Sequence, residues 1–301
     1  MLYRGYAFHS LQGSIEQTMN NNINLIVTHP GMAHRDEVIS ISLLLASVAP
    51  GARIERRNPT VAEMEDPTVL VVDTGMAYDR AKGNLDHHQE ICEDSAPGCA
   101  ITKVLEYLGQ DPQVARKAWR WLAGTEVIDS KGPKALAKFF AMGVEAVYDM
   151  QSPMEGALLR WFGGMTTIKP DDPGYNLLEM VGNDLLKELR ETEPRLQLLA
   201  QVVRYEQVSD LNVANATAID RNDRPTFATE AFFRGSNVEV VVSQDDRGSG
   251  YSLFRRDDAP NVDFTRIKDD PEVIFAHGGG FIAKTAPGAD WRRLVAAARV
   301  E

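Results

Sequence analysis

The stretch Ile23-Asn24-Leu25-Ile26-Val27-Thr28-His29-Pro30-Gly31 decides the fold class of this 301-residue chain. Ile23 to Val27 is a short apolar run that predicts a β-strand, and Thr28 to Gly31 is a turn that contains Pro and Gly. A helix is expected to follow from about Asp36 to Val48. Polar residues therefore stand at the carboxyl end of a strand, where open α/β sheets place their ligands.

The same pattern recurs along the next eighty residues. Ala52 to Arg57 predicts a strand, and the continuous apolar run Val69 to Val72 predicts a strand that is buried on both faces. Gly83 to Asp86 predicts a further strand end, and Ile101 to Leu108 predicts a helix. This alternation indicates an α/β fold, with a mostly parallel sheet flanked by helices.

The remainder of the chain predicts a change of architecture and a second domain. Helical spacing of apolar residues continues to Phe162, and a long connecting helix is expected from Tyr175 to about Val208. Strands are expected at Val238–Val242, Ser252–Arg256 and Val273–Ala276, followed by a closing helix at Trp291–Arg299. The predicted organisation is an N-terminal extension (1–22), a metal-binding domain (23–172), a helical connector (173–210) and a smaller α/β substrate-binding domain (211–301).

The composition excludes several classes of protein. Hydrophobic residues make up 44% and charged residues 25%, which is typical of a globular protein, and the net charge of −11 argues against a generally basic nucleic-acid coat. Cys92 and Cys99 give no disulfide framework; they are either a redox pair or reduced packing residues. The first 22 residues do not resemble a secretion signal, and no apolar run approaches the length that crosses a membrane, so a cytoplasmic location is expected.

Histidine is the most informative residue type. The chain has six, and five of them fall in three short segments, of which Asp86-His87-His88 is the most distinctive. Two adjacent imidazoles beside a carboxylate cannot all be accommodated in an apolar core, because each would carry unmet hydrogen-bonding capacity. Imidazole and carboxylate are also the ligands of borderline divalent metals. The triplet therefore predicts half of a metal site.

The other half is predicted at the ends of the earlier strands. His29, His34 and Asp36 follow the first strand across one turn, and Asp73 follows the buried strand directly. A solitary Asp there is usually a helix cap, but two histidine clusters at neighbouring strand ends favour a ligand. Asp129 is a further candidate whose local spacing alone indicates a cap or a turn. Such a set supplies enough ligands for two ions about 3.5–4 Å apart, a recurrent device for phosphoester hydrolysis, and its mixed nitrogen and oxygen donors suit Mn, Zn, Co or Fe.

Several motifs occur in an order that resembles a known family. They are Thr28-His29-x-Gly31-x-x-His34-x-Asp36-Glu37, Asp73-x-Gly75-x-x-Tyr78-Asp79, Asp86-His87-His88-Gln89, Ser95-Ala96-x-Gly98, Ile128-Asp129 and His277-x-x-Gly280-Phe281-Ile282. The chain resembles the DHH phosphoesterase superfamily, and within it the MYG branch of metal-dependent hydrolases with nuclease activity. It departs from the usual patterns at Ala33, His34 and Asn58, where relatives tend to have an aromatic, a carboxylate and an acidic residue.

The resemblance implies two ions, usually Mn²⁺, in a cleft between two α/β domains. His29, His34 and Asp73 would hold one ion; Asp36, Asp73, His87 and Asp129 would hold the other, with Asp73 bridging. His88 would act in catalysis beside Asp73 and contact the phosphate or the leaving group, and Asp86 would orient an imidazole from outside the ligand set. His277 and Gly278, Gly279 and Gly280 would bind substrate from the second domain.

Two features near that glycine run have alternative interpretations. The glycines themselves could form a tight turn without a ligand. Arg255 and Arg256 could bind phosphate, but neighbours on a strand point to opposite faces, so only one can face the site and Arg255 is the candidate.

The sequence thus predicts a dinuclear hydrolase that cleaves phosphoesters in nucleotides or short single-stranded oligonucleotides, as an exonuclease does, and that has no membrane partner. The first alternative is a small-molecule phosphatase or pyrophosphatase, because the acidic balance does not favour long nucleic acids. The second alternative is a metal-stabilised binding module without turnover, which the apparently complete ligand set disfavours.

Overall fold

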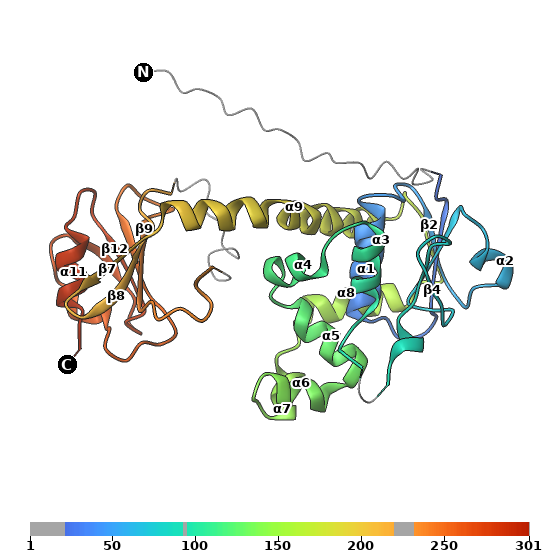
Figure 1. Cartoon of the computed structure of the whole chain (residues 1–301), viewed down its shortest axis with the longest axis horizontal. Coiled ribbons are helices and arrows are strands. Elements are labelled where there is room, and N and C mark those ends of the chain that lie inside the picture. The colour runs from blue at the N-terminus through green and yellow to red at the C-terminus, as the bar shows by residue number, and fades with distance from the viewer. Residues whose placement is uncertain (1–21, 93–94, 220–231, 301) are drawn as a thin grey trace, which may run out of the picture. The chain divides into compact units, whose positions relative to one another are not determined.

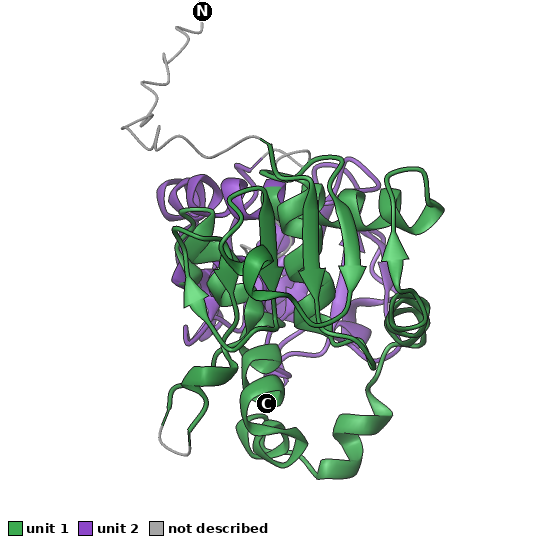
Figure 2. Ribbon diagram, turned by 90° about the vertical axis from the view of Figure 1, so that its right-hand side faces the viewer, with its two compact units in different colours: residues 1–112, 121–186 green, residues 113–120, 187–301 purple. Residues whose placement is uncertain are grey.

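The computed structural model describes residues 22–92, 95–219 and 232–300, which form two compact units (Figure 2). The first unit comprises the described residues up to Pro112 together with Trp121–Leu186, and the second comprises Gln113–Arg120 and the described residues from Lys187 onward. The predicted N-terminal extension lies outside the described residues except for Asn22. The domain boundaries expected from the sequence remain a prediction.

The first unit is built on a six-stranded sheet in the order β4-β5-β3-β1-β2-β6. The four central strands are parallel to one another: β1 (Leu25–Thr28), β2 (Arg53–Arg56), β3 (Val69–Val72) and β5 (Asn84–Leu85). Only the edge strands β4 (Tyr78–Asp79) and β6 (Thr167–Ile168) are antiparallel. The predicted mostly parallel sheet is therefore confirmed.

Helices cover both faces of this sheet, as the uninterrupted apolar runs require. Every residue of β1 and β3 is buried, because α1 (Arg35–Leu45) and α3 (Ala100–Tyr107) lie on one side and α2 (Val61–Met64) lies on the other (Figure 1). On the α2 side, Met64 packs against a small cluster of apolar strand residues: Leu25, Val27, Val69 and Val71. Sequence patterning of this kind is sufficient to predict both layers.

The rest of the first unit is helical. A 3₁₀ turn at His88–Glu90 follows β5, and the helices of this unit that come after α3 are α5 (Leu122–Lys131), α6 (Pro133–Phe139), α7 (Val144–Asp149) and α8 (Pro153–Gly163). The short helix α4 (Pro112–Ala118) precedes α5 in the chain, and all of it after Pro112 belongs to the second unit. The long helix α9 (Pro173–Val202) contributes residues to both units.

The predicted end of the long helix at Val208 is wrong. The helix ends at Val202, and Arg204–Val208 forms strand β7, which pairs residue by residue with β8 (Leu211–Asn215). Ser209 and Asp210 both adopt positive φ angles and make the tight turn between the two strands. Backbone pairing with a neighbouring strand, which the local sequence does not reveal, decides the structure of this segment.

The second unit contains another six-stranded sheet, in the order β11-β12-β10-β9-β8-β7. Its later strands are β9 (Val240–Gln244), β10 (Tyr251–Arg255), β11 (Val273–Ala276) and β12 (Ile282–Thr285), and all pairs are antiparallel except β8 with β9. A 3₁₀ turn (Phe264–Ile267) and α11 (Trp291–Ala297) pack on one face and share an apolar core with the sheet. The expected strand at Val238–Val242 therefore begins and ends two residues later.

No helix among the described residues is long and apolar enough to cross a membrane. Both cysteines are free: Cys99 is buried, as a packing residue would be, and Cys92 is exposed.

The close approach of α9 to α1 can be tested by substitution of a glycine at their contact. A Cβ atom at Gly182 on α9 would overlap the backbone carbonyl of Ser42 on α1, whereas one at Gly156 on α8 would meet only the flexible end of Arg160. We predict that Gly182→Ala lowers the free energy of unfolding by about 1–3 kcal/mol through overpacking, measured by urea denaturation. Gly156→Ala is the control and is expected to be neutral or stabilising by about 0.5–1 kcal/mol. Equal effects of the two changes would contradict the close packing of α9 on α1.

Candidate metal centre

The candidate centre begins with the register of three parallel strands. Thr28 of β1 is opposite Val72 of β3, and Val72 is opposite Leu85 of β5. His29, Asp73 and Asp86 are the next residues after these three, so they emerge at the same edge of the sheet. The strand β1 lies between β2 and β3, so the chain changes direction across the sheet at β1 and β3, which is the point where open α/β sheets bind ligands.

Two helices bring further candidates to this edge. His34 immediately precedes α1, and Asp36 lies in the first turn of α1, where its Oδ2 accepts a hydrogen bond from the backbone N–H of Ala100 at 3.2 Å. Asp129 lies inside α5 and is half-buried. The cap or turn that its local spacing indicates is therefore wrong, because the helix continues past it to Lys131.

The imidazole of His87 is surrounded by three carboxylates. Its Nε2 atom lies 3.0 Å from Asp129 Oδ2, 3.3 Å from Asp73 Oδ1 and 4.0 Å from Asp36 Oδ2. The structure therefore brings together all four residues predicted to hold one ion.

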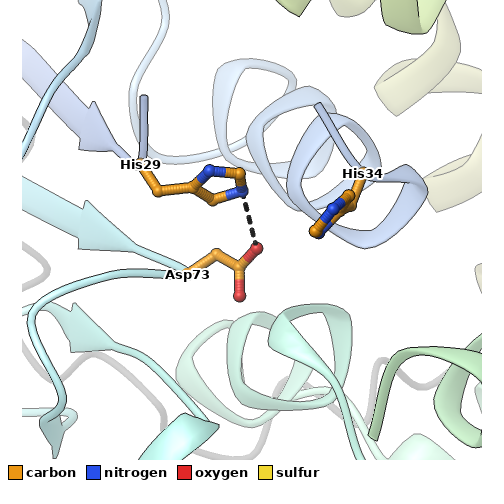
Figure 3. A group of neighbouring side chains, drawn as sticks. All are labelled: His29, His34 and Asp73. Carbon is orange, nitrogen blue, oxygen red and sulfur yellow. Dashed lines mark ion pairs between the residues drawn. The ribbon is translucent and has the colours of Figure 1, made fainter. Parts of the chain in front are cut away.

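The imidazole of His29 occupies a matching position on the other side of Asp73. Its Nε2 atom lies 3.5 Å from Asp73 Oδ2 and 3.3 Å from Glu37 Oε2. Figure 3 shows His29, His34 and Asp73 directed toward one space, and one donor atom from each of the three lies within 4.8 Å of the others. Asp73 thus has one oxygen toward each imidazole.

The geometry of the donor atoms in this cluster suits coordination of a divalent metal better than hydrogen bonding among the atoms themselves. Six of them are buried without a hydrogen-bond partner among the described residues: His29 Nε2, His87 Nε2, Asp36 Oδ1, both carboxylate oxygens of Asp73, and Asp129 Oδ2. They are close to their neighbours, but the geometry of a hydrogen bond is not met. Two ligands that lie about 2.1 Å from an ion and at right angles to each other are about 3 Å apart, which is the spacing seen around His87.

Charge in the centre is balanced by protons when no ion is bound. Burial opposes the charged form of both imidazoles, but nearby carboxylates outweigh it: Asp73 and Glu37 raise the pKa of His29 to about 9, and Asp129 and Asp73 raise the pKa of His87 to about 10. Burial would raise the pKa of Asp73, but His29 and His87 lower it to about 2. Burial, followed by Asp73 and Asp129, raises the pKa of Asp36.

Glu37 and Arg56 also belong to the centre, although the sequence does not predict a role for either. Glu37 is fully buried and accepts hydrogen bonds from Thr28 Oγ1 at 2.8 Å and from Arg56 Nε at 3.3 Å. The Arg56 guanidinium also donates to the carbonyls of Gly31 and Gly163, at 3.0 and 2.9 Å. Arg56 therefore braces both the carboxylate beside His29 and the loop between His29 and His34.

The sequence indicates the position of Glu37 in part and does not indicate the role of Arg56. Glu37 stands next to Asp36 in a quoted motif, and burial of a helix's first turn against a strand end follows from the fold. Arg56 ends a strand with exposed or half-buried charged neighbours, so nothing local distinguishes it from a surface arginine.

Asp86 and His88 form a second pair beside the ligands. His88 Nδ1 lies 2.7 Å from Asp86 Oδ1, and this hydrogen bond raises the pKa of His88. Asp86 is fully buried and also accepts from the backbone N–H groups of His88 and Met76, at 3.0 and 2.7 Å. The imidazole that Asp86 orients is therefore His88, whose ring is partly exposed.

The remaining predicted residues belong to the second unit. His277 Nδ1 accepts a hydrogen bond from the N–H of Gly279 at 3.0 Å, and Gly280 has a φ of 68° with no room for a Cβ atom beside Asp263. The Arg255 guanidinium donates to the carbonyl of Val262 at 2.9 Å. The glycines thus form a tight turn, which was one of the two interpretations, and the substrate roles of this group remain a prediction.

Arg256, the other arginine of the pair, is occupied by its own neighbours. Its guanidinium lies over the Phe233 ring, 5.4 Å from the centroid, and 3.3 Å from Asp257. Its side chain is almost wholly buried.

Comparison with known families gives a match over part of the chain. A family model, MYG1_exonuc, described as an uncharacterised protein family (UPF0160), matches residues 25–104. The predicted resemblance to the MYG-type family is confirmed over this segment, which contains every predicted ligand except Asp129. The wider resemblance to the DHH superfamily remains a prediction from the sequence motifs. None of the curated proteins compared with the chain matches it significantly.

Three solved structures show a weak likeness to this chain. A DHH domain from a member of a family of ribosomal proteins is 15% identical, with coverage of 93% of this chain and 86% of that one and a TM-score of 0.31. RecJ from Thermus thermophilus with Mg²⁺ is 12% identical, with coverage of 90% and 48% and a TM-score of 0.29. An exopolyphosphatase-related protein from Bacteroides fragilis is 10% identical, with coverage of 91% and 90% and a TM-score of 0.25. Likenesses at these TM-scores carry no argument about activity.

The buried pair of Arg56 and Glu37 gives a first test of the centre. We predict that Arg56→Met lowers the free energy of unfolding by about 3–5 kcal/mol, because it removes the buried cation that is hydrogen-bonded to the buried Glu37 carboxylate. The same change is expected to weaken Mn²⁺ binding about 10–100-fold, since Glu37 and the His29 loop lose their support. Urea denaturation and calorimetric titration measure the two effects.

The adjacent Arg57 is the matched control for this change. Its side chain is more than one-third exposed and pairs with Glu55 and Glu63 at the surface, so Arg57→Met is expected to cost about 1 kcal/mol or less. Equal losses in the two variants would contradict the bracing role of Arg56.

The raised pKa values of His29 and His87 predict a pH dependence of metal binding. At pH 7 both imidazoles carry a proton in the ion-free protein, so binding of Mn²⁺ must release protons, and affinity should rise with pH and level off near pH 10. Calorimetry in buffers of different ionisation enthalpy counts the released protons, and His87→Ala should release about one fewer. Binding at pH 7 without proton release would contradict the assignment.

The raised pKa values of His29 and His87 also determine how the free energy of unfolding of the metal-free protein changes with pH. The folded pKa values lie above the ordinary 6.5, so protonation stabilises the fold fully below that pH. This contribution is lost as the pH rises through about 9 to 10.

Proposed function

We propose that this chain is a phosphoester hydrolase that uses a dinuclear metal centre. The observation that carries the proposal is the set of buried imidazole and carboxylate atoms that converge without hydrogen-bond partners among the described residues. His29, His34 and Asp73 would hold one ion, and Asp36, Asp73, His87 and Asp129 the other. The nitrogen and oxygen donors, with no thiolate in the set, suit Mn, Zn, Co or Fe, and the resemblance to the MYG family favours Mn²⁺ among them.

Bound divalent ions would supply hydroxide near neutral pH and neutralise charge on the phosphoryl oxygens. The chain itself contributes the placement of these charges, because the strand ends and α1 hold the carboxylates rigidly before substrate arrives. His88, which Asp86 keeps protonated more readily than a free histidine, lines the same cavity and would donate a hydrogen bond or a proton to the phosphate or the leaving oxygen.

The cavity at the centre has a volume of about 550 Å³, which suits a nucleotide or the end of a short single strand. All of its lining residues belong to the first unit. The MYG-type match supports a nuclease-like activity. Contacts from His277, Gly278, Gly279, Gly280 and Arg255 to the substrate, and a cytoplasmic location, remain predictions from the sequence.

We predict that Asp73→Asn and His87→Ala each abolish Mn²⁺-dependent phosphoester hydrolysis. Asp73→Asn removes the negative charge of the proposed bridging carboxylate, and His87→Ala removes a proposed metal-ligating imidazole. Circular dichroism should show that the fold survives in both variants. Asp171→Asn, at an exposed loop position of the same unit, is the control and should retain full activity. Unchanged turnover in Asp73→Asn would exclude the proposed centre.

A screen of metals against substrates separates the proposed activity from its alternatives. Chelated protein reloaded with Mn²⁺, Co²⁺ or Zn²⁺ should release mononucleotides from short single strands. Cleavage of pyrophosphate alone would establish the small-molecule phosphatase, and stoichiometric metal binding without hydrolysis of any phosphoester would establish the binding module.

A further inference from the structure

The cavity at the metal centre has two chemically different walls. One wall carries the imidazoles and carboxylates already described: His29, His34, Asp73, Asp86 and His88. The other wall is made by Asn58, Pro59, Met64, Thr74, Gly75 and Met76. None of the described residues that line the cavity is Lys or Arg. The second wall therefore has no cation to offer an additional phosphate.

Part of the second wall is a fixed apolar surface. Gly75 has a φ of 91°, and a Cβ atom built on it would lie 3.4 Å from both Met64 Cε and Pro59 Cγ. Met64 is anchored from behind, because it packs on the strand residues Val69 and Val71. The missing side chain at Gly75 thus leaves room for a thioether and a proline ring to meet at the cavity surface.

Met76 completes this wall in a conformation that its residue type does not favour. Its φ is 53°, and the residue remains 64% exposed, so neither backbone preference nor burial accounts for its position. The backbone is fixed instead by the hydrogen bond from its N–H to Asp86 Oδ2. Strained residues that persist in this way are concentrated at ligand-binding positions.

From this wall we propose that Met64, Met76 and Pro59 form the surface that contacts the planar base of a nucleotide substrate. The inference rests on the proposed function and assigns the residues that contact the base. Methionine sulfur packs favourably on aromatic rings, and the Asn58 amide offers a donor and an acceptor to the edge of a base. Inorganic pyrophosphate would place its second phosphate against thioethers and a proline, where no cation balances its charge.

Binding can be tested without turnover by methyl NMR. The protein is labelled with ¹³C-methyl methionine, loaded with diamagnetic Mg²⁺ and titrated with adenosine 5′-monophosphate or with inorganic phosphate. The Met64 and Met76 signals should shift with the nucleotide and remain unchanged with phosphate. Met180, which is 60% exposed and does not line the cavity, is the matched control and should not shift. Equal shifts with both ligands, or none at Met64 and Met76, would overturn the proposal.

Kinetics with two diesters of one leaving group test specificity. The p-nitrophenyl ester of thymidine 5′-phosphate carries a base, and p-nitrophenyl methyl phosphate does not. Met76→Ala should raise KM about fivefold for the first substrate and leave the second unchanged, while Met180→Ala should change neither. An equal loss on both substrates would show that Met76 acts only on the structure and would overturn the proposal.

A third variant separates contact from folding. Met76→Gly removes the side chain and relieves the positive φ, so its Tm should equal or exceed that of the wild type while the KM effect persists. Restoration of wild-type KM by this change would mean that backbone geometry, and not the thioether, determines specificity. If the wild-type protein hydrolyses neither diester with any metal, the proposed function fails, whereas the NMR result still decides the base-binding wall.

Discussion

The parallel register of β1, β3 and β5 is the constraint on which the rest of the structure depends. Because Thr28, Val72 and Leu85 are aligned across three strands, the residues that follow them reach one edge of the sheet together. A shift of one residue in either pairing would turn His29 or Asp73 to the opposite face. Burial of β1, β3 and β5 opposes such a shift, because a changed register would bring their buried apolar residues into new surroundings. The geometry of the candidate metal centre therefore depends on the packing of the core.

The centre concentrates more charge than a protein interior tolerates without compensation. Asp36, Glu37 and Asp73 are almost completely buried, and Arg56 is the buried cation bonded directly to one of them. Protons on His29 and His87 supply the remaining balance in the absence of an ion, as their raised pKa values indicate. A divalent ion that replaced those protons would balance the same negative charge, so the site would favour cations even without substrate.

Most of the sheet and most of the centre could be predicted from the sequence because their signals are local. Apolar runs mark β1 and β3, and each is followed at once by a polar residue that the parallel topology brings to the shared edge. The position of Asp129 was harder to predict, because its local sequence indicates a cap or a turn. Tertiary packing, which the local sequence does not show, allows helix α5 to continue past it. Strand β7 and the bracing role of Arg56 could not be predicted, since the first depends on pairing with β8 and the second on contacts with Gly31 and Gly163.

Asp86 holds two residues that border the cavity, His88 and Met76, for which we propose different roles. One oxygen of its carboxylate holds the ring of His88, and the other holds the backbone of Met76. His88, which we propose contacts the phosphate, and Met76, which we propose contacts the base, are therefore both held by one carboxylate. A substitution at Asp86 that altered substrate specificity would therefore also disturb the position of His88. During evolution, a change in specificity would have to arise by substitution of Met76, which leaves Asp86 and His88 in place.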